Sequence, residues 1–161
     1  MNMGVYAIQS AIYGTGENPI SVSAQEFSTR PDYFKDTDET IMAQFEFPSG
    51  AVANMSTSHN FNANSMYVSG TSGWFQLQPA NNYGPLSGKT SKGEELKFPH
   101  ESQQKLQMDD FAKHVLYGEP NKAPGEMGKR DMMIVEAIYA SIAKGGQTMG
   151  LDFEPGFGFG G

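Results

Sequence analysis

The sequence of 161 residues contains no cysteine. This absence excludes disulfides, thiolate nucleophiles, cysteine-based zinc sites and iron–sulfur ligation. Basic residues are also few, because 11 lysines and arginines stand against 18 acidic residues and give a net charge of −7. The basic residues are scattered rather than gathered in a stripe. Nucleic acid and anionic membrane surfaces are therefore not expected as partners.

Long apolar runs are missing as well. No membrane span is expected, and the N-terminus lacks the basic patch and apolar run of a secretory leader. We therefore expect a soluble, cytoplasmic protein. The length predicts one domain, which we place at residues 1–152, followed by a flexible Gly/Phe-rich tail at 153–161.

Nucleotide and metal motifs are incomplete. Gly14-Thr15-Gly16 lacks the third glycine of a dinucleotide fingerprint and follows a predicted helix, so a helix stop is favoured. Residues 84–90, GPLSGKT, have three residues between their glycines where a phosphate loop needs four, which favours a surface turn. The histidines have no metal-binding spacing: His59, His100 and His114.

Hydrophobic periodicity predicts a helix, then strands, then two helices. The first helix covers 1–13, and the later ones run from 100 to 117 and from 124 to 144. From Thr40 onward one side of a strand is apolar and the other polar, and a turn at 48–50 predicts a hairpin. Strands are expected at 20–28, 40–47, 51–60, 65–70, 73–79 and 96–99, with a loop at 80–95.

This order predicts an α+β fold, an open, mostly antiparallel sheet with helices packed on one face, and no Rossmann domain in the chain. The outward side of the hairpin is moderately polar. We expect it to mediate self-association, as an isologous homo-oligomer interface, through Met42, Gln44, Asn54 and Ser56.

Four strings carry a resemblance to a known family. They are MGVYAIQSAIYGTGENPISVSA (3–24), DETIMAQFEFPSGAVANMSTS (38–58), GWFQLQPANNY (73–83) and QQKLQMDDFAKHVLYGEPNKAPGEMGKRDMMIVEAIYASIAKG (103–145). Together they resemble the C-terminal domain of the Gfo/Idh/MocA oxidoreductases, most closely the glucose-fructose oxidoreductase branch. The similarity runs in order from about Asn2 to Asp152.

The resemblance implies a two-domain enzyme whose N-terminal Rossmann half binds NAD(P) and supplies a catalytic lysine. The C-terminal half would complete the substrate pocket and pair with another subunit through its open sheet face. In that branch an Asp-x-Gly-x-Tyr string faces the nicotinamide, and here it reads Asn2-Met3-Gly4-Val5-Tyr6. The resemblance therefore makes Tyr6 and Asn2 the candidate catalytic positions.

The asparagine departs from the family pattern. An amide can hydrogen-bond a sugar hydroxyl but cannot transfer a proton, whereas a general acid or base contributes about 10²–10⁴ in rate. Without the resemblance, Tyr6 is an ordinary half-buried aromatic residue and Asn2 a helix N-cap.

The resemblance also implies three substrate-binding positions. Tyr83 matches a family position near the pocket, although a loop tyrosine packed on the sheet explains it nearly as well. Gln104 and Asp109 lie on the helix that borders the cleft in relatives, and a polar helix face is the alternative.

Two functional hypotheses follow. The first is the substrate-binding and assembly domain of an NAD(P)-dependent oxidoreductase acting on a sugar or polyol. Such a chain would bind no cofactor alone, be inactive alone, and need a Rossmann domain supplied elsewhere. The second is a free-standing, non-catalytic sugar-binding or oligomeric scaffold protein derived from that domain.

Overall fold

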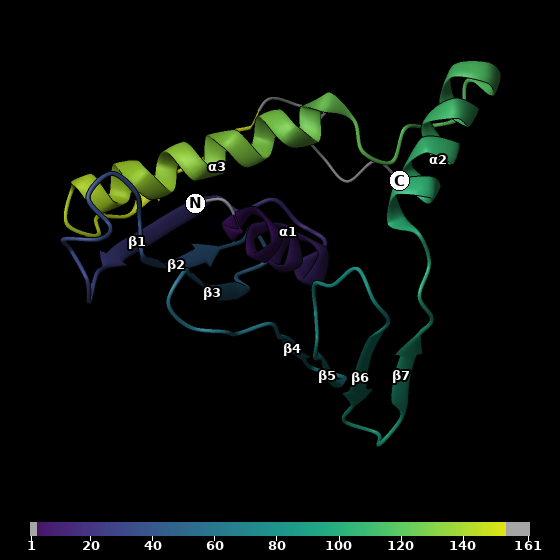
Figure 1. The fold of residues 1–161 in the computed structure, drawn as a ribbon, viewed down its shortest axis with the longest axis horizontal. Helices are drawn as coiled ribbons and strands as arrows, with labels where there is room; N and C mark the ends of the chain where they lie inside the picture. Colours follow the sequence, from purple (N-terminus) through teal and green to yellow (C-terminus); the bar gives the residue numbers. More distant parts are fainter. Residues whose placement is uncertain (1–2, 154–161) are drawn as a thin grey trace. The chain divides into compact units, whose positions relative to one another are not determined.

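A computed structural model describes residues 3–153, which form three helices and eight strands in two compact units (Figure 1). The first unit takes the described residues up to Asn62 and from Pro124 onward, and the second takes Ala63–Ala123. None of the helices within 3–153 is long and apolar enough to cross a lipid bilayer. The first unit contains α1 (Gly4–Thr15), β1 (Ser21–Phe27), β2 (Thr40–Glu46), β3 (Val52–Ser58), α3 (Gly125–Ala143) and β8 (Met149–Gly150).

The first sheet is antiparallel, with strand order β3-β2-β1-β8. Its register places Phe45 between Val22 and Ala53. Because side chains alternate along a strand, the register gathers the apolar side chains on one face. The buried members of that face are Val22, Ala24, Ile41, Ala43, Phe45 and Met55.

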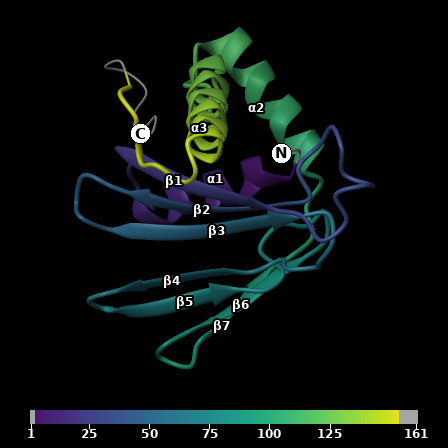
Figure 2. The same cartoon turned by 90° about the vertical axis from the view of Figure 1, so that its left-hand side faces the viewer.

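Helices α1 and α3 cover this apolar face. Ile8 and Ile12 of α1 join Ile134 and Ile138 of α3 in one hydrophobic cluster with the sheet. Figure 2 shows α3 lying over β1, with β1, β2 and β3 side by side. Helix α1 ends at Gly16, which takes a left-handed conformation at φ 73° and donates its N–H to the Ile12 carbonyl.

A fully buried serine joins α3 to the sheet. Strand β8 pairs with β1 only at Ser21 and Val22, so the N–H of Ala24 lies beyond the last strand pair. The Ser141 hydroxyl accepts a hydrogen bond from this N–H at 2.9 Å and donates to the Gln147 carbonyl at 2.7 Å. One side chain thus satisfies two backbone groups.

A buried carboxylate organises the loop between β1 and β2. Glu39 is 1% exposed and accepts hydrogen bonds from the Ser28 hydroxyl (2.8 Å), the Thr29 hydroxyl (2.7 Å) and the backbone N–H groups of Thr29 (2.8 Å) and Arg30 (3.0 Å). Burial opposes the charge of Glu39, but these hydrogen bonds outweigh it and lower the pKa of the carboxyl from 4.5 to about 2.

The second unit contains a separate antiparallel sheet and one helix. Its elements are β4 (Met66–Gly70), β5 (Gly73–Leu77), β6 (Leu86–Thr90), β7 (Glu95–Phe98) and α2 (Gln103–Tyr117), with strand order β4-β5-β6-β7. The Ser102 hydroxyl caps α2 by accepting from the Lys105 N–H, and Gly118 ends it. No residue within 63–123 is buried.

The structure confirms the α+β class with open antiparallel sheets. It confirms the hairpin turn and the helix stop at Gly16, and it distributes the strands over two sheets where the sequence predicts one. Two predictions are wrong, because the expected surface turn at 84–90 contains β6 and the loop at 80–95 is therefore too long. Strand β8 was not predicted, and most of the expected tail lies outside the described residues.

Replacing the buried serine tests the connection between α3 and β1. Ser141→Ala leaves the Ala24 N–H and the Gln147 carbonyl without their shared partner. We expect the free energy of unfolding to fall by about 2 kcal/mol, measured by urea denaturation. The exposed Ser72→Ala serves as the control and should leave it unchanged. Equal stability of the two variants would contradict this account.

Replacing the buried carboxylate tests the loop. Because the folded-state pKa of Glu39 lies below its ordinary value, its contribution to stability is present above pH 4.5 and is lost as the pH falls toward 2. Glu39→Gln directs an amide donor at groups that also donate, so the urea midpoint at pH 7 should fall and its dependence on pH between 4.5 and 2 should weaken. The exposed Glu136→Gln is the control, and a Glu39→Gln profile parallel to that of the wild type would refute the assignment.

Candidate functional site

Tyr6 lies in the first turns of α1 and points away from the core. Gly4, Ile8 and Ile12 form the buried side of the helix. Tyr6 is 45% exposed, and Tyr13, seven residues further along the same side, is 58% exposed. The phenol is therefore accessible to a ligand.

A buried polar network holds α1 against α3. Gln9 of α1 donates through Nε2 to Asp131 Oδ2. Arg130 donates to Asp131 Oδ1 through Nε at 3.1 Å and a terminal nitrogen at 3.0 Å, and its other terminal nitrogen donates to Asn18 Oδ1 at 3.3 Å. Arg130 is only 4% exposed, and a buried charge needs a partner. The neighbouring Asp131 carboxylate compensates it. The network sets the rotation of α1 and thereby the outward direction of Tyr6.

Sequence reasoning missed this network. The spacing along α3 could have revealed it. Arg130 and Asp131 precede Ile134 by four and three residues, so they lie on the same side of the helix as its apolar residues. A charged pair on the buried side of a helix needs a polar partner, and Gln9 provides it. Among residues 3–153, Gln9 Oε1 is the one buried side-chain atom that lacks a hydrogen-bond partner.

A second tyrosine of the first unit has a structural role. The Tyr139 hydroxyl on α3 donates to Asp38 Oδ1 at 2.6 Å. Burial raises the pKa of Tyr139 above its usual value, and the Asp38 carboxylate raises it further by accepting the bond and by its charge. The phenol therefore stays protonated and joins α3 to the residue before Glu39.

The structure places the other predicted site residues as follows. Asn2 lies outside the described residues. Tyr83, in the loop between β5 and β6, is 66% exposed, and Gln104 and Asp109 are exposed on α2. Gln104 and Asp109 are five positions apart, so they project about 140° apart around the helix.

The start of α2 lies next to the Tyr83 loop. Gln103 Nε2 donates to the Asn82 carbonyl at 2.8 Å, so Tyr83 and Gln104 each adjoin one partner of this bond. Tyr83, Gln104 and Asp109 belong to the second unit, whereas Tyr6 belongs to the first.

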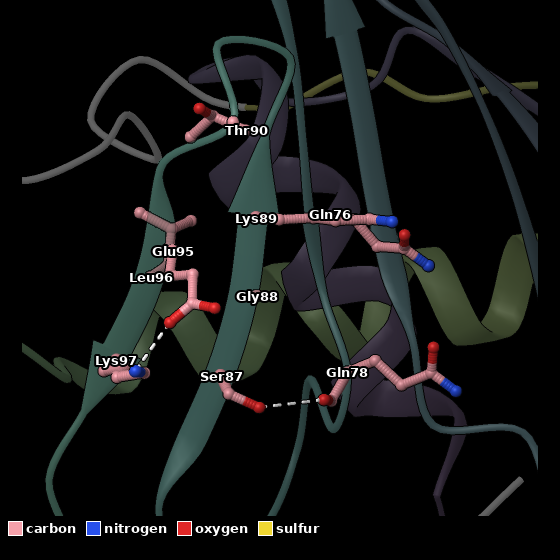
Figure 3. Close-up of a pocket in the computed structure, with 10 residues that line it drawn as sticks. Gln76, Gln78, Ser87, Gly88, Lys89, Thr90, Glu95, Leu96 and Lys97 are labelled. Atoms are coloured by element: carbon pink, nitrogen blue, oxygen red, sulfur yellow. Dashed lines mark hydrogen bonds and ion pairs between the residues drawn. The ribbon is translucent and has the colours of Figure 1, made fainter.

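The second sheet also carries an open polar groove of about 600 Å³ (Figure 3). None of the residues predicted from the sequence lines it. Gln76 and Lys89 lie side by side, Lys97 pairs with Glu95, and the Ser87 hydroxyl donates to the Gln78 carbonyl at 3.1 Å.

The two glycine motifs do not fit a dinucleotide. The Gly16 N–H is bonded to the end of α1, and no strand-to-helix turn surrounds it. Residues 86–90 form a strand paired on both sides, so their amides cannot close around a phosphate. Within residues 3–153, no group of three or more His, Asp or Glu side chains is arranged to hold a metal ion.

Comparison with known proteins identifies the family and the fold of the chain. Residues 1–76 match the family model for the GFO/IDH/MocA C-terminal domain. The chain is similar to the aldose-aldose oxidoreductase from Caulobacter crescentus, solved in complex with glycerol, at 32% identity and a TM-score of 0.83, over 92% of this chain and 46% of that chain.

Two more distant structures share the fold. One is an oxidoreductase from Agrobacterium radiobacter in complex with NAD⁺, L-tartaric acid and magnesium (TM-score 0.71, 15% identity, 92% of this chain and 47% of that chain). The other is the myo-inositol 2-dehydrogenase from Lactobacillus plantarum (TM-score 0.66, 17% identity, 92% and 47%). The chain spans about half the length of these structures. The match of residues 1–76 to the family model and the 32% identity to the aldose-aldose oxidoreductase show that the chain belongs to the GFO/IDH/MocA C-terminal domain family.

Proposed function

We propose that this chain is the substrate-binding and assembly part of an NAD(P)-dependent oxidoreductase that acts on a sugar or polyol. The observation that carries the proposal is the outward position of Tyr6 on a helix whose opposite side is fixed by Gln9, Arg130 and Asp131. Relatives named for an aldose and for myo-inositol favour a polyhydroxylated substrate.

The chemistry assigned to this chain is substrate positioning. The Tyr6 hydroxyl would hydrogen-bond a substrate hydroxyl and can donate a proton to a developing alkoxide, and the Asn2 amide would add a hydrogen bond. Hydride transfer belongs to the nicotinamide, which the proposal assigns to a Rossmann domain outside this sequence.

Assembly is assigned to the open face of the first sheet. Met42 is 47% exposed there, and Gln44 Nε2 donates to Asn54 Oδ1 at 3.0 Å. A shallow groove of about 480 Å³ runs across this face, lined among others by Met42, Asn54, Ser56 and Gly146. A second copy related by a two-fold axis would cover it, because the same surface then meets itself.

Ligand binding by the 161-residue chain tests the assignment of substrate and cofactor. Saturation-transfer NMR with D-glucose, D-xylose and myo-inositol should detect binding of at least one. Tyr6→Phe should weaken that binding about two- to tenfold, which is the loss of one net hydrogen bond. Tyr13→Phe, about 10 Å further along α1, is the matched control.

Two results would contradict the proposal. One is micromolar binding of NADP to this chain in a calorimetric titration, which would place the cofactor site here. The other is failure of the sugar test, either because the wild type binds no sugar or because Tyr6→Phe leaves the binding unchanged.

Sedimentation tests the assembly surface. Met42→Lys buries an unpaired charge in the expected interface, so the dissociation constant of the oligomer should rise about tenfold or more. Met132→Lys is the matched control, because Met132 is 50% exposed on α3. A wild-type chain that stays monomeric at high concentration, or equal effects of both variants, would refute the interface.

A further inference from the structure

The second sheet has a face that the proposed function does not use. We call it the β4–β7 polar face and define it by Tyr67, Trp74, Gln76, Lys89, Glu95 and Lys97. Strand register places Tyr67 opposite Gln76, Gln76 opposite Lys89, and Lys89 opposite Glu95. These pairs form one continuous row across all four strands, which spans about 14 Å.

Aromatic rings occupy one end of this row. The Tyr67 and Trp74 rings stack with centroids 5.6 Å apart and an angle of 30° between their planes. Lys89 Nζ lies 5.9 Å from the centre of the Trp74 ring. Tyr67 remains 59% exposed on an edge strand. An apolar ring surface of this kind suits a ligand with a flat C–H face.

Hydrogen-bond donors and acceptors occupy the rest of this face. The groove in Figure 3 is lined by the Gln76 and Gln78 amides, which each offer donors and an acceptor, and by Ser87. Lys97 is paired with Glu95, and Lys89 faces Glu95 in the register. Two lysines and one carboxylate leave a single net positive charge on the face, which is too little to select a polyanion and is compatible with an uncharged ligand.

We propose that the β4–β7 polar face binds a neutral oligosaccharide. A sugar ring has a C–H face for Tyr67 and a rim of hydroxyls for Gln76, Gln78 and Glu95, and the row is longer than one ring. A polyanion such as single-stranded nucleic acid is disfavoured by the net charge of −7. This surface belongs to the second unit and does not involve Tyr6.

The test uses the intrinsic fluorescence of the chain. Trp74 is the single tryptophan, so its emission reports on this face alone. We expect a saturable change in emission when maltohexaose, cellohexaose or xylohexaose is added to the 161-residue protein, and no dependence on salt. No change with any of the three, or a salt-sensitive response to a dT12 oligonucleotide alone, would overturn the proposal.

Variants assign the response to individual side chains. Tyr67→Ala should raise the dissociation constant at least about tenfold, Tyr67→Phe should preserve it, and Gln76→Ala should raise it by a smaller factor. The control Tyr117→Ala removes a tyrosine that is 74% exposed on α2, and Tyr6→Phe separates this surface from the proposed substrate site. Wild-type affinity in Tyr67→Ala and Gln76→Ala, or equal loss in Tyr6→Phe, would refute the site.

Discussion

The two-residue period of β2 is the constraint on which the first unit depends. Ile41, Ala43 and Phe45 point to one face, and Met42 and Gln44 point to the other. The apolar face must be covered because exposed aliphatic and aromatic surface costs about 25 cal/mol per Å². Both helices of the first unit meet this need, so they share one face and leave the other open. The outward position of Tyr6 on α1, which carries the proposed ligand site, and the polar sheet face proposed as the interface are both consequences of this single division.

Apolar packing alone leaves a helix free to rotate by a fraction of a turn, and the buried polar groups remove that freedom. A buried ion pair such as Arg130 with Asp131 gains little net stability, because desolvation offsets the attraction. Its hydrogen bonds are directional, however, and connect α3 to Gln9 in one orientation. Ser141 does the same between α3 and β1. The buried hydrogen bonds on the inner side of α1 thus determine the direction in which Tyr6 points outward.

Sequence patterns predicted the elements that are specified by residues close to one another in the sequence. The hairpin around Gly50, the helix stop at Gly16 and the apolar side of α3 each depend on neighbouring residues. Strand β6 was hidden by Gly88, which is required because a Cβ there would clash with the backbone oxygen of Gln76, a contact that only the register creates. The four hydrogen bonds to Glu39 come from residues 9 to 11 positions away with no periodic signal.

The second unit interrupts the first between β3 and α3. During synthesis, α1 and β1–β3 leave the ribosome before α3, the helix that packs on β1. The nascent chain therefore carries a half-covered apolar sheet for as long as Ala63–Ala123 is being translated. Such a surface is a target for chaperones and a hazard for aggregation. The second unit thus leaves the finished core intact, but the time needed to translate it delays the completion of that core.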